Sequence, residues 1–156
     1  MKNLLLILLI VLSLTGYGQV NSVIPPEVNN FYNNAMRTVN PSIKNFIETS
    51  ANNLKGRTVN IDSLSKAIQK DKLLKNANRR EIDALTVLIM VQASKNADTE
   101  LKNLVINMNR EGKEAKNQSS QKAEIILANK SQIAENVSLV SKDIPFSSES
   151  LLTNLR

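Results

Sequence analysis

The sequence predicts an all-α protein: a helical bundle in which shorter N-terminal helices pack a long antiparallel helical hairpin, formed by about residues 79–111 and 120–141. Apolar residues recur at three- and four-residue spacings through most of the chain, which is the period of an amphipathic helix. Only 3% of the 156 residues are aromatic and only four are glycine, which disfavours a turn-rich β-sandwich or barrel. No Pro-rich or Gly/Ser-rich linker divides the sequence, so we expect one helical domain over residues 27–142.

Residues 1–18 have the features of a cleavable export signal. Lys2 supplies a positive charge, an apolar run of 11 residues with one serine follows over positions 4–14, and small and polar residues lead to Gly18. A membrane-spanning helix needs about 20 apolar residues, so this run is too short to be an anchor. We therefore expect cleavage near Gly18, an irregular lead over residues 19–26, and a mature protein in the periplasm or outside the cell.

Two helices, or one kinked helix, are expected next. One apolar stripe predicts the first helix: Val28, Phe31, Tyr32, Ala35, Met36 and Val39. Asn40 and Pro41 interrupt it, and they are a good N-cap and a good first helical residue, so a new helix can begin there. The stripe continues in phase across Pro41, because Val39 and Ile43 are four residues apart, and this leaves open a tight corner or a single helix kinked at Pro41. Gly56 is expected to end this region.

A further helix is expected after a short β-prone connector, residues 57–61. Either Asn60 or Asp62 can cap it. Its apolar side consists of Ile61, Leu64 and Ile68. Beyond residue 70, basic residues would share that side of a continuous helix, and burying them would be costly. We therefore expect a bend, a break or surface exposure somewhere within residues 70–78.

Asn78 and Glu81 have the spacing of a capping box, which predicts the start of the longest helix, about residues 79–111. Residues 82–91 are apolar almost all round, so this part of the helix should be central and buried. The polar stretch 94–99 is a position at which the helix could bend.

Residues 111–122 contain no large apolar residue, so they should form a turn, or two exposed helix ends joined by a turn. The last strong helix then covers about residues 120–141. Three apolar residues in it recur every seven positions and resemble a coiled-coil seam: Ile126, Ile133 and Val140. Lys130 lies within this seam. It either fixes the register of the helix pairing or lays its aliphatic stem over the edge of the core. Residues 143–156 are expected to form a tail or a short helix.

The composition excludes several kinds of catalytic site. The chain has no His and no Cys, so it has no Ser-His-Asp triad, no Cys-His pair, no zinc site of the usual ligands and no disulfide. Its closest carboxylate pairs, such as Glu81 with Asp83 and Asp98 with Glu100, are two residues apart and do not share a helix face. No EF-hand loop or Gly-rich phosphate loop occurs in the sequence. We expect no enzymatic activity, no cofactor and no metal.

A basic segment, residues 66–80, is the most informative polar feature. It holds six basic residues against one acidic residue, Asp71: Lys66, Lys70, Lys72, Lys75, Arg79 and Arg80. One interpretation is contact with an anionic surface, such as lipid headgroups or acidic glycan. The other is a solvated helix junction whose cations keep the chain soluble, which their projection on several sides favours. Nucleic acid is not expected as a partner, because the segment has no aromatic side chain for stacking on bases.

The apolar stripes exceed what a two-helix hairpin can bury. They must therefore close a bundle or serve a partner. We expect an exported, non-enzymatic helical protein that acts through protein–protein contacts in the periplasm or outside the cell, with a protein partner or as a homo-oligomer. The alternative function is peripheral binding to anionic envelope surfaces through residues 66–80.

Overall fold

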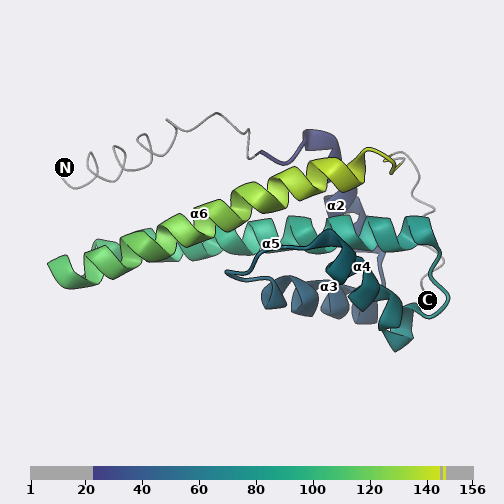
Figure 1. The fold of residues 1–156 in the computed structure, drawn as a ribbon, viewed down its shortest axis with the longest axis horizontal. Coiled ribbons are helices and arrows are strands. Elements are labelled where there is room, and N and C mark those ends of the chain that lie inside the picture. Colours follow the sequence, from purple (N-terminus) through teal and green to yellow (C-terminus); the bar gives the residue numbers. More distant parts are fainter. Residues whose placement is uncertain (1–22, 145, 147–156) are drawn as a thin grey trace.

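The computed structural model describes residues 23–144 and residue 146, with the backbone but not the side chains of residues 113–115. The export signal expected over residues 1–18 lies outside the described residues, as does most of the expected tail. In the described part the chain forms helices and no strand, and the helices pack against one long central helix, α5 (Figure 1). The all-α prediction is confirmed.

Helices α2 (Pro26–Thr38) and α3 (Pro41–Asn53) meet at a tight corner, the first of the two predicted alternatives. Asn40 is extended, and its side-chain oxygen accepts a hydrogen bond from the backbone N–H of Ile43 at 2.9 Å. Pro41 then occupies the first turn, where its missing N–H costs nothing. After α3 ends, Gly56 adopts a φ of 62° in the following turn, a conformation that glycine reaches at little cost.

The predicted break within residues 70–78 is confirmed. Helix α4 (Ile61–Lys70) is capped by Asn60, and a short 3₁₀ helix, η2 (Lys72–Leu74), separates it from α5. Because the chain turns here, the apolar side chains of Ile68 and Leu74 are buried while the lysines of this stretch stay in solvent.

Helix α5 (Arg79–Met108) is the axis of the fold. Its capping box is present, since the backbone N–H of Asn78 donates to Glu81 Oε2 at 2.7 Å and the N–H of Glu81 donates to Asn78 Oδ1 at 3.0 Å. The first of these bonds gives a hydrogen-bond partner to the buried carboxylate of Glu81. The helix stays unbroken through residues 94–99, where a bend was considered. Its 30 residues span roughly 45 Å.

Helix α6 (Lys113–Ser141) packs along α5, and only residues 109–112 connect the two (Figure 1). It begins at residue 113 instead of about residue 120, so the predicted start of the helix was wrong. Residues 111–122 form the second of the two predicted alternatives, in which two helix ends are joined by a turn. The first turns of α6 are rich in Lys, Glu, Ala and Gln, which favour helix without needing an apolar face. Apolar periodicity detects only buried helix faces and therefore missed them.

The core lies where α2, α3 and α4 cover one half of α5. It is formed by side chains that are almost fully buried, among them Val28, Ile47, Ile68, Leu85, Leu88, Ile89, Ile133 and Val137. Residues flanking the expected domain also take part: Ile24 and Ile144 are buried, and the rings of Phe31 and Phe146 meet edge to face with their centroids 5.7 Å apart. The central burial predicted for residues 82–91 is confirmed, with Asp83 alone among them only half-buried.

Candidate functional site

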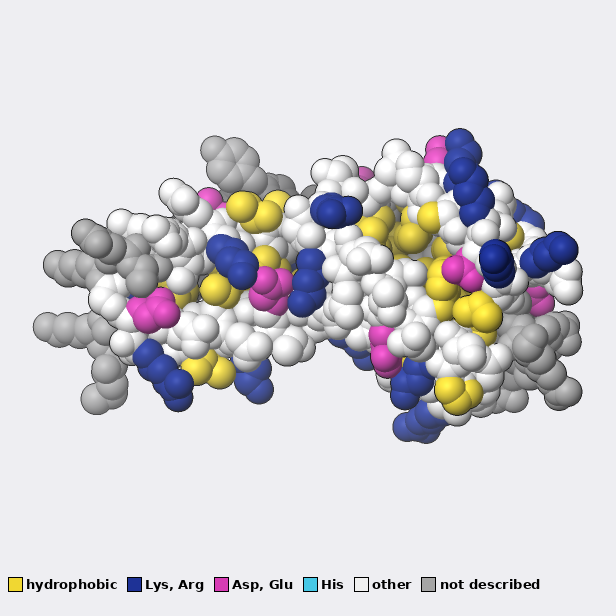
Figure 2. All heavy atoms as spheres, turned by 90° about the horizontal axis from the view of Figure 1, so that it is seen from below, with side chains coloured by type: hydrophobic (Ala, Val, Ile, Leu, Met, Phe, Trp, Pro, Cys, Tyr) yellow, Lys and Arg dark blue, Asp and Glu magenta, His cyan; other side chains and the backbone are white. Residues whose placement is uncertain are grey.

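The six cations of the basic segment are all exposed. Lys66 and Lys70 lie one turn apart on α4, the lysines at 72 and 75 belong to η2 and the turn after it, and both arginines begin α5. Arg79 forms an ion pair with Asp83 at 3.0 Å on the same helix. Figure 2 shows Lys and Arg side chains at several places around the half of the molecule that contains α3 and α4, instead of in one compact patch.

Leu73 is an apolar side chain in the middle of this basic segment and is 55% exposed. The carboxylate of Asp71 accepts a hydrogen bond from the Leu73 N–H at 2.9 Å, which fixes the start of η2. The neighbouring Leu74 enters the core. Because side chains in one tight turn point in different directions, burial of Leu74 leaves Leu73 facing water. The sequence did not single out Leu73, because periodicity cannot say which of two adjacent leucines is buried.

A second surface is the arm, which we define as residues 98–125 of α5 and α6. It extends beyond the part of the molecule that α2, α3 and α4 cover (Figure 1). None of its described side chains is buried. Leu101, Leu104 and Met108 are half-buried. Three large apolar side chains are exposed: Val105, Ile106 and Ile125.

The arm is held together by polar contacts and small residues. Lys122 Nζ lies 3.0 Å from a carboxylate oxygen of Glu100, and Lys130, just beyond the arm on α6, pairs with Asp98. The half-buried positions of α6 within the arm are Lys116 and three small residues, Ser119, Ser120 and Ala123. Such small side chains cannot cover the apolar face that α5 presents, which explains why that face stays partly in water.

A polar network joins α2, α3 and α5 next to the core. The hydroxyl of Tyr32 donates to Gln92 Oε1, the Gln92 amide donates to Asn96, and Asn96 donates to Asn52. The ammonium of Lys95 lies 4.4 Å from the centroid of the Tyr32 ring. Burial of the phenol, together with the negative charge of Glu48, raises the Tyr32 pKa above its usual value of 10.0. The sequence indicates Tyr32 only as part of an apolar stripe, and no local pattern in it predicts these partners.

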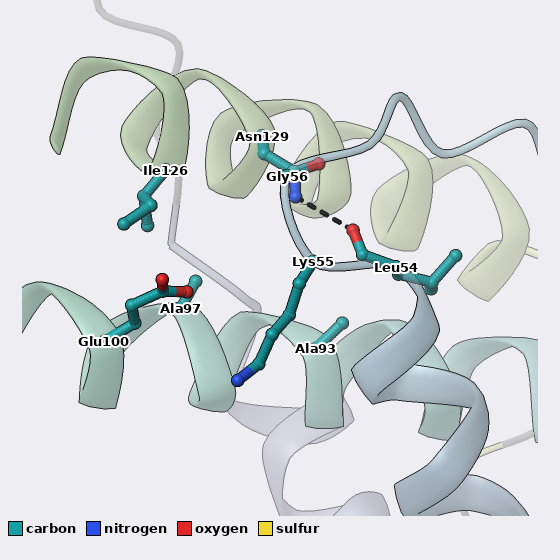
Figure 3. A pocket seen from close by; sticks show the side chains of 8 residues that line it. All are labelled: Leu54, Lys55, Gly56, Ala93, Ala97, Glu100, Ile126 and Asn129. Atoms are coloured by element: carbon teal, nitrogen blue, oxygen red, sulfur yellow. Dashed lines mark hydrogen bonds between the residues drawn. The ribbon is translucent and has the colours of Figure 1, made fainter. Parts of the chain in front are cut away.

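An open polar groove of about 240 Å³ lies beside this network. It is lined by Asn52, Lys55, Asn96, Thr99, Glu100 and Asn103. Lys55 and Glu100 also border a smaller pocket of about 10 Å³ between α3, α5 and α6, shown in Figure 3. There the Asn129 amide donates to the Leu54 carbonyl at 3.2 Å, the contact drawn as a dashed line. That space holds about one water molecule and is too small for a substrate.

The groove does not provide paired catalytic carboxylates. Glu100 is its one acidic residue, and this carboxylate is engaged by Lys122. Over residues 23–144 and 146, no group of three or more Asp and Glu side chains could hold a metal ion. The described helices also include none that is long and apolar enough to cross a membrane.

Comparison with protein-family models, with curated proteins and with solved structures found no match to this chain.

Proposed function

We propose that this chain is an exported, non-enzymatic helical protein that acts through protein–protein contacts in the periplasm or outside the cell, and that the arm makes these contacts. The observation that carries the proposal is the exposure of Val105, Ile106 and Ile125 on an arm in which no described side chain is buried. All three lie on this protruding element (Figure 1), where exposed apolar side chains are available to a protein partner.

The arm is proposed to be the end of an antiparallel hairpin formed by α5 and α6. The short connection over residues 109–112 supports this arrangement. The two ion pairs support it as well, because Lys130, the later residue on α6, pairs with the earlier residue Asp98, and Lys122 pairs with Glu100.

The proposed partner of the arm is a second copy of this chain. Residues 98–125 contain five basic and five acidic residues, so the arm has no formal net charge. A symmetric contact brings the same patch of each subunit together, and a neutral patch of mixed sign does so without net repulsion. The basic segment, by contrast, would repel its own copy.

The test is the mass in solution of residues 19–156, which include every described residue. Light scattering over a range of concentrations should report a dimer, and Ile125→Ser should shift the equilibrium towards monomer by roughly tenfold, since about half of an isoleucine side chain would lose its cover. Leu139→Ser is the matched control, because Leu139 is also on α6 and is 51% exposed, but lies outside the arm. A wild-type monomer at every concentration, or equal effects of the two variants, contradicts the proposal.

A second candidate function is peripheral binding to anionic envelope surfaces through the basic segment. All six of its cations are exposed, which favours this function. Reversing the charges of Lys70, Lys72, Lys75 and Arg79 together should abolish binding to anionic vesicles at low salt, and raising the salt should weaken wild-type binding. Vesicle binding that survives charge reversal contradicts this function.

A further inference from the structure

We infer that η2 is the point at which the basic segment meets an anionic lipid bilayer, with the side chain of Leu73 inserted among the headgroups. This inference rests on the second proposed function and adds to it the class of ligand, the orientation of the molecule and the residue that enters the lipid. The observation behind it is that the exposed side chain of Leu73 has an exposed lysine on each side of it along the chain, Lys72 and Lys75.

The exposure of Leu73 is set by the fold of the turn. The Leu73 N–H donates to the Asp71 carboxylate at 2.9 Å, and the Leu74 N–H donates to the Asp71 carbonyl at 3.1 Å. The turn closes with the Ala77 N–H, which donates to the Leu74 carbonyl at 2.9 Å, while Leu74 itself is 2% exposed. Two buried anchors, Ile68 and Leu74, therefore hold η2 in place with Leu73 on its outer side.

The charges around Leu73 are available to a partner. Lys72 and Lys75 flank it along the chain, and Lys70 ends the preceding helix. Within the part of the chain that the structure describes, these three lysines form no ion pair. Asp71, the acidic residue of the segment, directs its carboxylate to the backbone N–H of Leu73 as the cap of η2. Its charge offsets only one of the six cations.

A lipid bilayer can contact both the exposed Leu73 side chain and the lysines around it, whereas other anionic ligands contact only the lysines. Inorganic phosphate or an acidic glycan would contact the lysines but would leave the Leu73 side chain in water. Stable attachment to a membrane surface takes two signals, such as a polybasic patch and an apolar group that enters the interface. Leu73 supplies the apolar group, and Lys70, Lys72 and Lys75 supply exposed cations next to it along the chain.

The chain contains no Trp, so Leu73→Trp introduces a single fluorescent reporter at the proposed contact. The substitution is made in residues 19–156, and the position is exposed, so the fold has room for the indole. With vesicles of phosphatidylglycerol and phosphatidylcholine, the emission should shift to the blue and be quenched by brominated acyl chains. Leu139→Trp is the matched control at a similarly exposed site on α6, and its emission should stay unshifted.

Two further variants separate the apolar contribution from the charges. Leu73→Ser should weaken vesicle partitioning by roughly five- to tenfold at every salt concentration, because about half of a leucine side chain no longer leaves water. Lys72→Gln with Lys75→Gln should weaken it by roughly thirtyfold at low salt and much less at high salt. Inorganic phosphate should displace the protein no more than sodium chloride of equal ionic strength.

The possible failures are distinguishable. If wild-type protein binds no anionic vesicle, the second proposed function and this inference both fall. If it binds but the indole at position 73 shows no shift or quenching, or Leu73→Ser binds as well as wild type, only the inference is overturned. Displacement by phosphate beyond the effect of ionic strength would identify a soluble phosphate as the ligand and would also overturn it.

Discussion

Substitution of three isoleucines on α6 by alanine should produce a graded loss of stability along that one helix. Ile133 is fully buried in the core, Ile126 is 5% exposed where the arm begins, and Ile125 is 57% exposed within the arm. The same exchange in the same helix changes helix propensity by a similar amount at each position. Differences among the three variants therefore report how well each side chain is packed.

The expected magnitudes follow from burial. Ile133→Ala removes a side chain that is fully buried in the core, so it should lower the free energy of unfolding by about 3 kcal/mol. Ile126→Ala lies next to the small pocket, where neighbours can relax, and should cost about 2 kcal/mol. Ile125→Ala should change the free energy by less than about 0.5 kcal/mol in dilute monomer.

Urea unfolding followed by circular dichroism measures the three variants against wild type. With a slope of about 2 kcal/mol per molar, Ile133→Ala should lower the midpoint by roughly 1.5 M while leaving the slope unchanged. The reasoning is refuted if Ile125→Ala costs as much as Ile133→Ala in dilute solution, since the arm would then be packed like the core. A cost for Ile125→Ala that grows with protein concentration would instead support the proposed contact between arms.

Two further predictions concern polar groups of the fold. Asn78→Ala removes the N-cap of α5 and should lower the free energy of unfolding by about 1 kcal/mol in the same urea assay. Asn78→Ser should retain most of the stability that the cap provides, because serine is also a good N-cap. An unchanged urea midpoint for Asn78→Ala would contradict the capping role. Tyr32 is the one tyrosine of residues 19–156, so phenolate absorbance titrates it alone, and its midpoint should lie above 10.0. Because folding raises the pKa of the phenol, the stability that the neutral phenol contributes is fully present below the pKa of the unfolded chain and is lost as the pH rises through the folded pKa. Tyr32→Phe should remove this loss of stability at alkaline pH. A Tyr32 titration midpoint at or below 10.0 would contradict the raised pKa.

The sequence predicted the Asn78 cap and offered Asn40 and Asn60 as caps among alternatives, because helix caps are local. Asn40, Asn60 and Asn78 each accept a hydrogen bond from the backbone N–H three residues later, so the pattern lies within four residues of sequence. The break before α5 was predictable for a related reason, since a continuous helix would have carried cations into the core.

The candidate surfaces were only partly predictable. The basic segment was identified from its charges, and its exposure follows from the cost of burying them. The exposure of Leu73 and the choice of Leu74 for the core depend on how η2 lies against α4 and α5, which no local pattern contains. The network from Tyr32 to Asn52 joins residues on three helices and depends on the same packing.

The sequence by itself determined that the described chain is helical, that Asn78 caps its longest helix, and which of its segments carries an excess of positive charge. These properties depend on residues within a turn or two of one another, because hydrogen bonding at helix ends and the period of an amphipathic face act over that range. Only the tertiary structure decided that α6 begins at residue 113, that no described side chain of the arm is buried and that one leucine of the basic segment faces water. Each of these depends on which helices cover which faces, and burial is a property of the assembled fold.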